Sequence, residues 1–439
     1  MANNDTVNAS PTKRFFLAVL IKDISFLDAI VELVDNSVDS ARSESGTANL
    51  GSKLIEIAYD NMHFSIKDNA AGISIRDAKD FVFRFGRSKD APTIPGSVGE
   101  FGVGMKRALF KIGRYFEVES WTNAEHLRVV VDVDKWESEP EEDPTNWTFP
   151  LVVAEKNTGQ HSPGTHITVN RLPEYAVEQL SSTHFGTQLM LTLKHAHTES
   201  LNAGLNITVN DQNVGVEVDT LLLSDEIKPI SYNETIRVSN KTVNVKMIVG
   251  VAEPELAKAG WYVFCNGRQI EQAEKTEKTG WNTALDEDQR TPKVHWQFRR
   301  FRGYLLFKSD EPNALPWNTT KTGLDVEAPV YRRVRSEMLS AMRQVIDFLN
   351  QVDAESESEG DRPLNAALES AQRTALRELP ENPKFSFKPS SNRPEKKMRI
   401  SYAVSAGIGQ IVKESIGATS NKEVGEKTFR YYVDAEGIE

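Results

Sequence analysis

The sequence lacks several features that define common protein classes. Cys265 is the single cysteine among 439 residues, which excludes an intrachain disulfide framework and fits a reducing compartment. No uninterrupted run of about 18 apolar residues occurs, so no membrane-spanning helix is expected. The N-terminal residues are polar and contain no apolar core of a signal peptide. These absences predict a cytoplasmic protein without a membrane partner.

Basic residues are also fewer than acidic residues. The 52 Lys and Arg residues face 63 Asp and Glu residues, which gives a formal net charge of −11. Such a field does not attract nucleic acid, so DNA binding would require a local basic patch. Two basic runs qualify, Phe298–Arg302 and Lys396–Arg399, with a solvated strand and a flexible tail as the alternatives. The Gly-x4-Gly-Lys-Ser/Thr motif is missing, so a P-loop enzyme is excluded.

An amphipathic helix is expected over Ile24–Arg42. Its apolar residues recur at steps of three and four, at Leu27, Ile30, Val31, Val34, Val38 and Ala41. Glu32, Asp35, Asn36 and Asp39 lie close to that stripe, and Glu32 and Asn36 are one turn apart. A carboxylate beside a carboxamide can activate a water molecule and hold a hard metal ion. A solvated acidic face is the alternative.

Two later stretches bear on that choice. Ile66–Ser74 reads as a strand that ends at Asp68 and continues into a turn of small residues. Gly96–Gly113 reads as a glycine-rich loop that opens into a helix near Val103. Glycines let the backbone approach phosphate oxygens, and a helix N-terminus directs free N–H groups at them. Either stretch alone also fits an ordinary turn or loop.

Taken in order, the three stretches resemble the motifs of the GHKL ATPases, which include gyrase B, Hsp90-class chaperones, histidine kinases and MutL. Residues 32–41 resemble the first motif, with its Glu-x-x-x-Asn core. Residues 68–72 resemble the second, with Ala70 in place of the usual first glycine, and residues 99–104 resemble the glycine-rich lid. Phe85–Lys89 and Lys106 are most similar to the MORC and MutL branch. The resemblance covers residues 12–170 strongly and residues 170–350 more weakly.

The resemblance implies a Bergerat-type α/β fold (an α+β sandwich), with one mixed, mostly antiparallel sheet covered by helices. The residue pattern points the same way, with helix–strand–strand–helix followed by several strands. Strands of the first domain are expected at 53–59, 62–67, 115–121, 125–133, 148–153 and 166–170. A helix is expected at 73–85.

The resemblance also implies the site. Glu32 would be the general base, Asn36 the Mg²⁺ ligand and Asp68 the acceptor for the adenine amino group. Lys321, in the 318–323 loop, would reach the γ-phosphate. The other expected nucleotide-binding residues are Asp39, Gly72, Ile73, Ser88, Lys89, Gly99, Gly102, Val103, Gly104, Met105, Lys106 and Thr165. ATP and Mg²⁺ are therefore the expected cofactors.

Five segments are expected along the chain. They are a disordered tail at 1–11, the ATP-binding domain at 12–174, a transducer-like (S5-like) α/β domain at 175–350, a region of one helix and linkers at 351–397, and a small module at 398–439. Helices are expected at 177–197, 330–350 and 362–379, and a proline-rich linker at 380–397. The last module resembles a ribbon-helix-helix unit and is expected to dimerise or to bind a partner.

The expected function is Mg²⁺-dependent ATP hydrolysis that drives dimerisation of the N-terminal domains, as a clamp or switch acting on DNA or on a protein client. The alternative is a nucleotide-sensing scaffold without catalysis. A histidine kinase is a weaker alternative, because no helical phosphoacceptor segment precedes the nucleotide-binding stretch. A plain α/β protein with coincidental motifs is the last.

Overall fold

The computed structural model describes residues 12–86, 95–99, 102–139, 147–282, 295–356, 362–387 and 402–437. The chain divides into two compact units, Met1–Pro389 and Ser390–Glu439, which are described separately. None of the described helices is long and apolar enough to cross a membrane.

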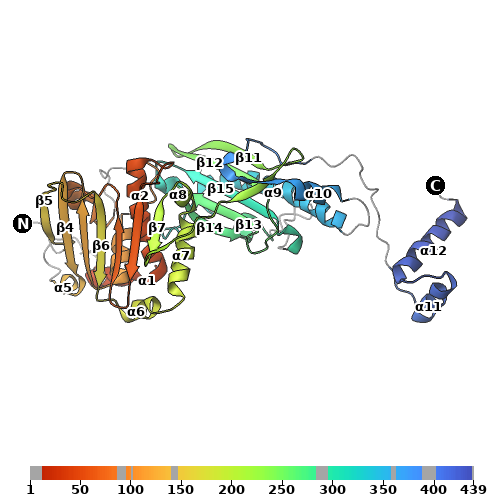
Figure 1. The fold of residues 1–439 in the computed structure, drawn as a ribbon, viewed down its shortest axis with the longest axis horizontal. Helices are drawn as coiled ribbons and strands as arrows, with labels where there is room; N and C mark the ends of the chain where they lie inside the picture. The colour runs from red at the N-terminus through yellow and green to blue at the C-terminus, as the bar shows by residue number, and fades with distance from the viewer. Residues whose placement is uncertain are drawn as a thin grey trace, which may run out of the picture. The chain divides into compact units, whose positions relative to one another are not determined.

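The first lobe of the large unit, residues 12–214, is built on an eight-stranded sheet (Figure 1). Its strand order is β5-β4-β3-β6-β2-β1-β7-β8. The strands are β1 Leu54–Tyr59, β2 Phe64–Asp68, β3 Tyr115–Trp121, β4 Glu125–Asp132, β5 Leu151–Lys156, β6 Gly164–Asn170, β7 Asn206–Val209 and β8 Gln212–Asn213. Every neighbouring pair is antiparallel except β1 and β7, which are parallel. The expected mixed, mostly antiparallel α/β fold is therefore confirmed.

Helix α2, Phe26–Ser45, is the central helix of this lobe. It begins after Ser25, whose Oγ accepts the Asp28 N–H at 3.0 Å, and it ends before Gly46, where φ is +74°. Its apolar stripe is buried in one core with the sheet. The other helices are α1 Lys13–Lys22, α3 Ile75–Asp77, α4 Gly104–Ile112, α5 Val133–Ser138, α6 Glu174–Leu180, α7 Phe185–Ala196 and α8 Thr198–Asn202.

Three expectations for this lobe need correction. The expected helix at 73–85 is a single turn, α3, followed by a π-helix, η1 Ala78–Val82. The expected helix at 177–197 breaks into α6 and α7. The expected boundary at 174/175 falls inside the lobe, because β7 pairs with β1 and the core continues to Val214. A periodic pattern cannot reveal which distant strand a late strand joins.

The second lobe, residues 220–387, centres on a five-stranded sheet in the order β11-β12-β15-β13-β14. These strands are β11 Ile230–Val238, β12 Lys241–Val251, β13 Gly260–Cys265, β14 Arg268–Glu274 and β15 Phe301–Lys308. The long helix α9, Pro329–Ser356, shares a core with them. Short helical turns are η3 Glu277–Thr279, η5 Trp296–Phe298, η6 Pro312–Ala314 and η7 Leu376–Glu378.

The chain after α9 returns to this lobe. Helix α10, Pro363–Ser370, is less than half the length expected for 362–379. Strand β16, Gln372–Ala375, follows it and pairs with β9, Thr220–Leu223. Strand β17, Ser386–Phe387, pairs with β10, Ile227–Lys228. The expected linker at 380–397 is therefore packed structure up to residue 387. The strand partners of β16 and β17 precede them by about 150 to 160 residues, which is beyond the reach of any local pattern.

The small unit contains α11, Ala406–Ser415, and α12, Asn421–Glu436. Residues 402–405 are not in a strand, and 398–401 lie outside the described residues, so the described part of this unit lacks the expected ribbon. No residue of either helix is buried. The expected tail at 1–11 also lies outside the described residues.

Candidate functional site

A cavity of about 480 Å³ lies where α2, the start of α4 and the ends of β2 and β6 meet a loop of the second lobe. The expected site residues converge on it from five separate parts of the chain. Those that line it are Glu32, Asn36, Asp39, Asp68, Gly72, Ile73, Gly99, Gly102, Val103, Gly104, Met105, Lys106, Thr165 and Lys321. Ser88 and Lys89 lie outside the described residues.

The Glu32 carboxylate is almost completely buried, with a 5% exposed side chain. Arg107 Nη2 donates to Glu32 Oε1 at 3.0 Å, and the Lys321 ammonium lies 3.6 Å from the same oxygen. The other oxygen, Oε2, lies against Gly104, the first residue of α4. The candidate base thus stands at the wall of the cavity, beside the helix N-terminus.

Asn36 lies one turn further along α2. Its Nδ2 donates to the Glu32 carbonyl oxygen at 2.6 Å, which leaves Oδ1 as the amide's ligand atom. The described residues contain no cluster of three or more His, Cys, Asp and Glu side chains that could hold a metal ion. Mg²⁺ commonly takes one or two protein ligands and completes its shell with phosphate oxygens and water. The residues present fit that mode of binding.

Asp68 is the last residue of β2 and is buried. Its Oδ2 accepts from Ser37 Oγ at 2.7 Å, and its Oδ1 accepts the N–H groups of Ala70 and Thr165 at 3.0 and 3.3 Å. Burial raises the pKa of this carboxyl group above its ordinary value, although the three donors oppose the shift. These donors fix the carboxylate at the cavity wall, where its remaining lone pairs can accept a further hydrogen bond.

The turn after Asp68 needs only one of the two usual glycines. Gly72 has φ +75°, and a β-carbon there would lie 1.9 Å from the Trp121 carbonyl oxygen. Ala70 is buried and lies outside the left-handed region. Alanine at position 70 is therefore compatible with the turn.

Asp39 supports the glycine-rich loop. Its carboxylate accepts the N–H groups of Val98 and Gly99, each at 2.9 Å. Burial raises its pKa to about 6 against the opposing effect of these two bonds. The side chain lines the cavity and at the same time fixes where the loop begins.

Lys106 lies in the first turn of α4, whose N-cap residue Val103 forms no side-chain cap. The uncapped N–H groups of that turn are available to an anion. The Lys106 ammonium donates to the Val82 carbonyl at 2.8 Å, and burial lowers its pKa to about 7. The cation stands at the cavity wall.

Lys321 enters the cavity from the second lobe. It sits at φ +55° in a turn where its N–H donates to the Asn318 carbonyl at 3.0 Å. Its ammonium lies 3.6 Å from Glu32 Oε1 and 3.7 Å from Asp35 Oδ2, and its side chain is 6% exposed. The second lobe thus contributes a cation to a cavity that is lined mostly by the first.

Several residues around the cavity were not expected. Arg107 was detectable, since it follows one turn after Gly104 on the helix that the glycine loop opens. The contacts of Arg268 and His197 with Asp35 had no local signal, because each spans more than 160 residues of sequence. Asn266, in the turn between β13 and β14, donates through Nδ2 to the carbonyl oxygens of Ser97 and Ser309, both at 2.9 Å.

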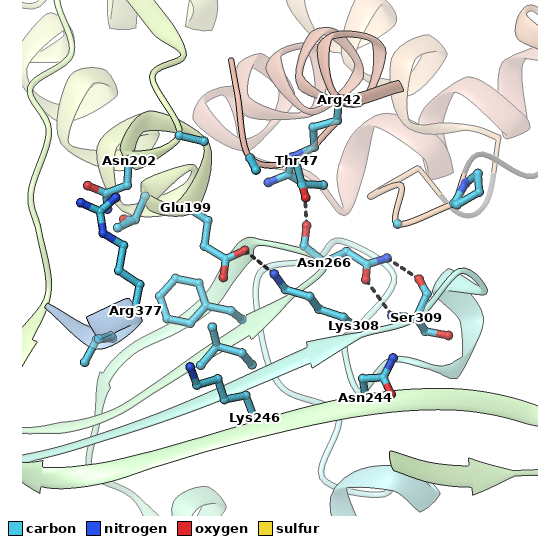
Figure 2. A pocket seen from close by; sticks show the side chains of 18 of the residues that line it. Arg42, Thr47, Glu199, Asn202, Asn244, Lys246, Asn266, Lys308, Ser309 and Arg377 are labelled. Carbon is cyan, nitrogen blue, oxygen red and sulfur yellow. Dashed lines mark hydrogen bonds and ion pairs between the residues drawn. The ribbon is translucent and has the colours of Figure 1, made fainter. Parts of the chain in front are cut away.

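A second cavity, of about 910 Å³, opens beside the other end of α2 (Figure 2). Arg42 and Asn266 face each other on its wall, where Arg42 Nη1 donates to the Asn266 carbonyl at 2.5 Å. Pro95 and Gly96 also line it, while Ser97 and Gly99 line the first cavity. The two cavities are therefore separated by the base of the glycine-rich loop.

The basic run Phe298–Arg302 does not form the phosphate-binding patch that its sequence suggested. Arg302 is buried and donates to backbone carbonyl oxygens, including that of Phe301 at 2.8 Å. Arg300 donates to the Ala252 carbonyl at 3.2 Å, and Arg299 lies over the ring of Trp296. These three arginine side chains therefore contact residues of their own lobe. The second run, Lys396–Arg399, lies outside the described residues.

Part of the chain matches a family model. Residues 24–165 match the family model described as histidine kinase-, DNA gyrase B- and HSP90-like ATPase. The matched segment contains α2, the Asp68 turn and the glycine-rich loop, and it ends at Thr165. The match supports membership of this segment in the GHKL superfamily and, in general terms, ATP binding and ATPase activity. No curated protein matches the chain.

Proposed function

We propose that this chain, through its GHKL-type segment, is a Mg²⁺-dependent ATPase whose second lobe monitors the γ-phosphate through Lys321. The observation that carries the proposal is a network of ion pairs, Arg107–Glu32–Lys321–Asp35–Arg268. It contains three cations and two carboxylates, and no side chain in it is more than 8% exposed. An excess of buried positive charge beside a helix N-terminus favours binding of a polyanion.

In the proposed complex each group has a distinct task. Asp68 accepts a hydrogen bond from the adenine amino group, and the first turn of α4 binds the phosphates. Asn36 would hold Mg²⁺, which would supply positive charge beside the phosphate oxygens. Glu32 takes a proton from the attacking water while the oxygen of that water bonds to the γ-phosphorus. The bond between the γ-phosphorus and the ADP oxygen breaks at the same time. A positioned base of this kind contributes about 10²- to 10⁴-fold to the rate.

We further propose that ATP closes the site and brings two N-terminal lobes together, so that turnover drives a clamp or switch acting on DNA or on a protein client, in the manner of the MORC and MutL branch. The exposed apolar side chains of α1 support a self-association surface there, since Phe15 and Val19 are 63% and 47% exposed. The small unit likewise exposes Ile411, Phe429 and Tyr431.

The test combines phosphate release with analogue binding for purified protein. Glu32→Ala is expected to bind a non-hydrolysable ATP analogue as the wild type does and to lose most turnover, whereas Asn36→Ala loses both. A doubling of mass with the analogue and Mg²⁺ would support the clamp. Equal turnover in wild type and Glu32→Ala would refute the catalytic role of Glu32.

One observation favours a second candidate, a nucleotide sensor in which turnover is incidental. Glu32 is ion-paired to both Arg107 and Lys321, so two cations compete with a water proton for the candidate base. Analogue binding without turnover in the wild type would select this candidate over the ATPase.

A further inference from the structure

Asp35 occupies an unusual place between the two lobes. It lies on α2, three residues after Glu32, and its side chain is 3% exposed. Both cations nearest to it come from the second lobe. Arg268 Nε, at the start of β14, lies 3.2 Å from Asp35 Oδ1, and Lys321 Nζ lies 3.7 Å from Oδ2.

These groups face one another without ordinary hydrogen bonds. Neither oxygen of Asp35, nor Arg268 Nε, nor His197 Nε2 has a hydrogen-bond partner among the described residues. His197 Nε2 lies 3.5 Å from Asp35 Oδ1, and burial lowers the pKa of this imidazole to about 3, so it is neutral. Burial also opposes ionisation of Asp35, but the charges of Arg268 and Lys321 outweigh it and hold its pKa below the ordinary value. The cluster is therefore held by charge rather than by fixed hydrogen-bond geometry.

The backbone around the cluster is tightly fixed. Asn266 and Gly267 form the turn between β13 and β14, and a β-carbon at Gly267, where φ is +76°, would lie 2.4 Å from Arg42 Nη2. Arg42 also donates to the Asn266 carbonyl, as Figure 2 shows. This turn places Arg268 against α2. The Lys321 ammonium, at the end of a long side chain and between two carboxylates, is the member of the cluster with the most freedom to move.

Stability alone is a poor reason for such a cluster. Removing charged groups from water costs several kcal/mol per ion, and well-packed apolar residues of similar volume often serve stability as well or better. The cluster has a functional role if turnover depends on the position of the Lys321 ammonium. Asp35 and Glu32 lie on one face of one helix, so together they hold the Lys321 ammonium at the wall of the cavity.

We propose that Asp35 is a positioning residue, which uses its ion pairs with Arg268 and Lys321 to tie α2 to the second lobe and to set the place of the Lys321 ammonium. The inference rests on the proposed function, since the position of Lys321 affects turnover only if ATP is hydrolysed here. Turnover then depends on the contact between the lobes, because Arg268 on β14 and Lys321 in the 318–323 loop both meet α2 through Asp35.

The kinetic test uses Asp35→Asn and, because that change leaves Arg268 buried without its carboxylate, the paired variant Asp35→Asn/Arg268→Met. We expect the affinity for the ATP analogue to stay close to that of the wild type, with kcat lower by about 10²-fold, as for the loss of one electrostatic group at a reaction centre. Lys321→Met should lose a similar factor. Asp35→Asn should cost nothing more in the Lys321→Met background, because both changes remove the same interaction.

Glu355→Gln is the matched control for loss of a buried carboxylate. Glu355 accepts the N–H groups of Leu364 and Asn365 in the second lobe, away from the cavity, and its substitution should leave kcat unchanged. Additive losses from Asp35→Asn and Lys321→Met, or a loss confined to affinity, would overturn the proposal.

A second readout does not need activity. In nucleotide-free protein, acetic anhydride should acylate Lys321 slowly relative to Lys308, whose side chain is 54% exposed. The paired variant should raise the rate at Lys321 by about tenfold, which corresponds to the loss of about 1.4 kcal/mol of restraint. Unchanged labelling would overturn the proposal even in an active ATPase. A wild type without turnover would refute the proposed function and leave the labelling result to decide on Asp35.

Discussion

Gly104 leaves space that Glu32 fills. A β-carbon at residue 104 would lie 2.0 Å from Glu32 Oε2 and 3.2 Å from the carboxyl carbon, well inside van der Waals contact. The first residue of α4 is therefore glycine because of the carboxylate beside it, and the candidate base and the phosphate-binding helix are fitted to each other.

Gly104→Ala is expected to displace the Glu32 carboxylate. The protein should still fold, because Glu32 is a side chain and can turn away, but phosphate release should fall by about 10²-fold as the base is misplaced. Gly425→Ala, on α12, meets nothing within 4 Å and is the control for a glycine-to-alanine change in a helix. Full activity in Gly104→Ala would mean that the position of Glu32 is unimportant.

Asp68→Asn tests the adenine assignment. The substitution keeps the shape of the side chain but removes the charged acceptor, so the dissociation constant for ATP should rise by about 10- to 100-fold, the range for a hydrogen bond to a charged group. Affinity for GTP, which carries no amino group at that position of the purine, should change little. Fluorescent-nucleotide competition measures both, with Asp60→Asn in an exposed turn as the control. Equal losses for ATP and GTP would reject the assignment.

The pKa of Lys106 predicts how the stability of the fold depends on pH. Burial lowers its folded pKa to about 7, whereas the unfolded chain keeps this proton up to a pKa of 10.5. Between these values the unfolded state binds more protons than the folded state, so this group makes the protein more stable as the pH rises from 7 towards 10. Lys106→Met should remove that gain, which urea unfolding at pH 7 and pH 9.5 would detect. An equal rise in wild type and variant would contradict it.

The same lysine couples nucleotide binding to protons. A phosphate beside the ammonium favours its charged form, so binding of an ATP analogue at pH 8 should take up a proton, and affinity should weaken as the pH rises from 7 to 10. Titration calorimetry in two buffers of different ionisation enthalpy measures the uptake. The Lys106→Met variant should show none of this uptake, and identical uptake in both proteins would exclude Lys106 as its source.

Removal of the small unit separates binding from assembly. A chain that ends at residue 389 keeps the whole of the large unit, so its thermal midpoint and analogue affinity should match the full chain. If α11 and α12 mediate self-association, the shortened chain should no longer double its mass when the analogue and Mg²⁺ are added. Light scattering after size exclusion measures this, and a mass that still doubles would assign the contact to the large unit.

The sequence allowed much of this structure to be predicted where the signal is local. Three features can be recognised within about 20 residues of sequence, the scale over which periodicity operates. They are the apolar stripe of α2, the strand that ends at Asp68 and the glycines of the loop. The order of these segments, through the family they resemble, extended the prediction to Lys321.

The rest depended on contacts that no local pattern encodes. From the sequence, Asp35 could not be told from the other polar residues of α2. Arg268, the cation that pairs with it, lies more than 230 residues away in the sequence. The pairing of β16 with β9 could not be predicted for the same reason. The basic run that ends at Arg302 was expected to be exposed, but the Arg302 guanidinium donates to backbone carbonyl oxygens. Charge can be read from a sequence, but its partners cannot.

The parallel pairing of β7 with β1 has a practical consequence for anyone who wishes to isolate the nucleotide-binding lobe. Leu54 to Ile57 pair with Asn206 to Val209, so a fragment that stops at residue 174 leaves β1 as an open edge strand with unpaired N–H and C=O groups. Such an edge invites pairing between molecules. A fragment designed from the motifs alone would therefore aggregate, and a soluble one must extend through Val214.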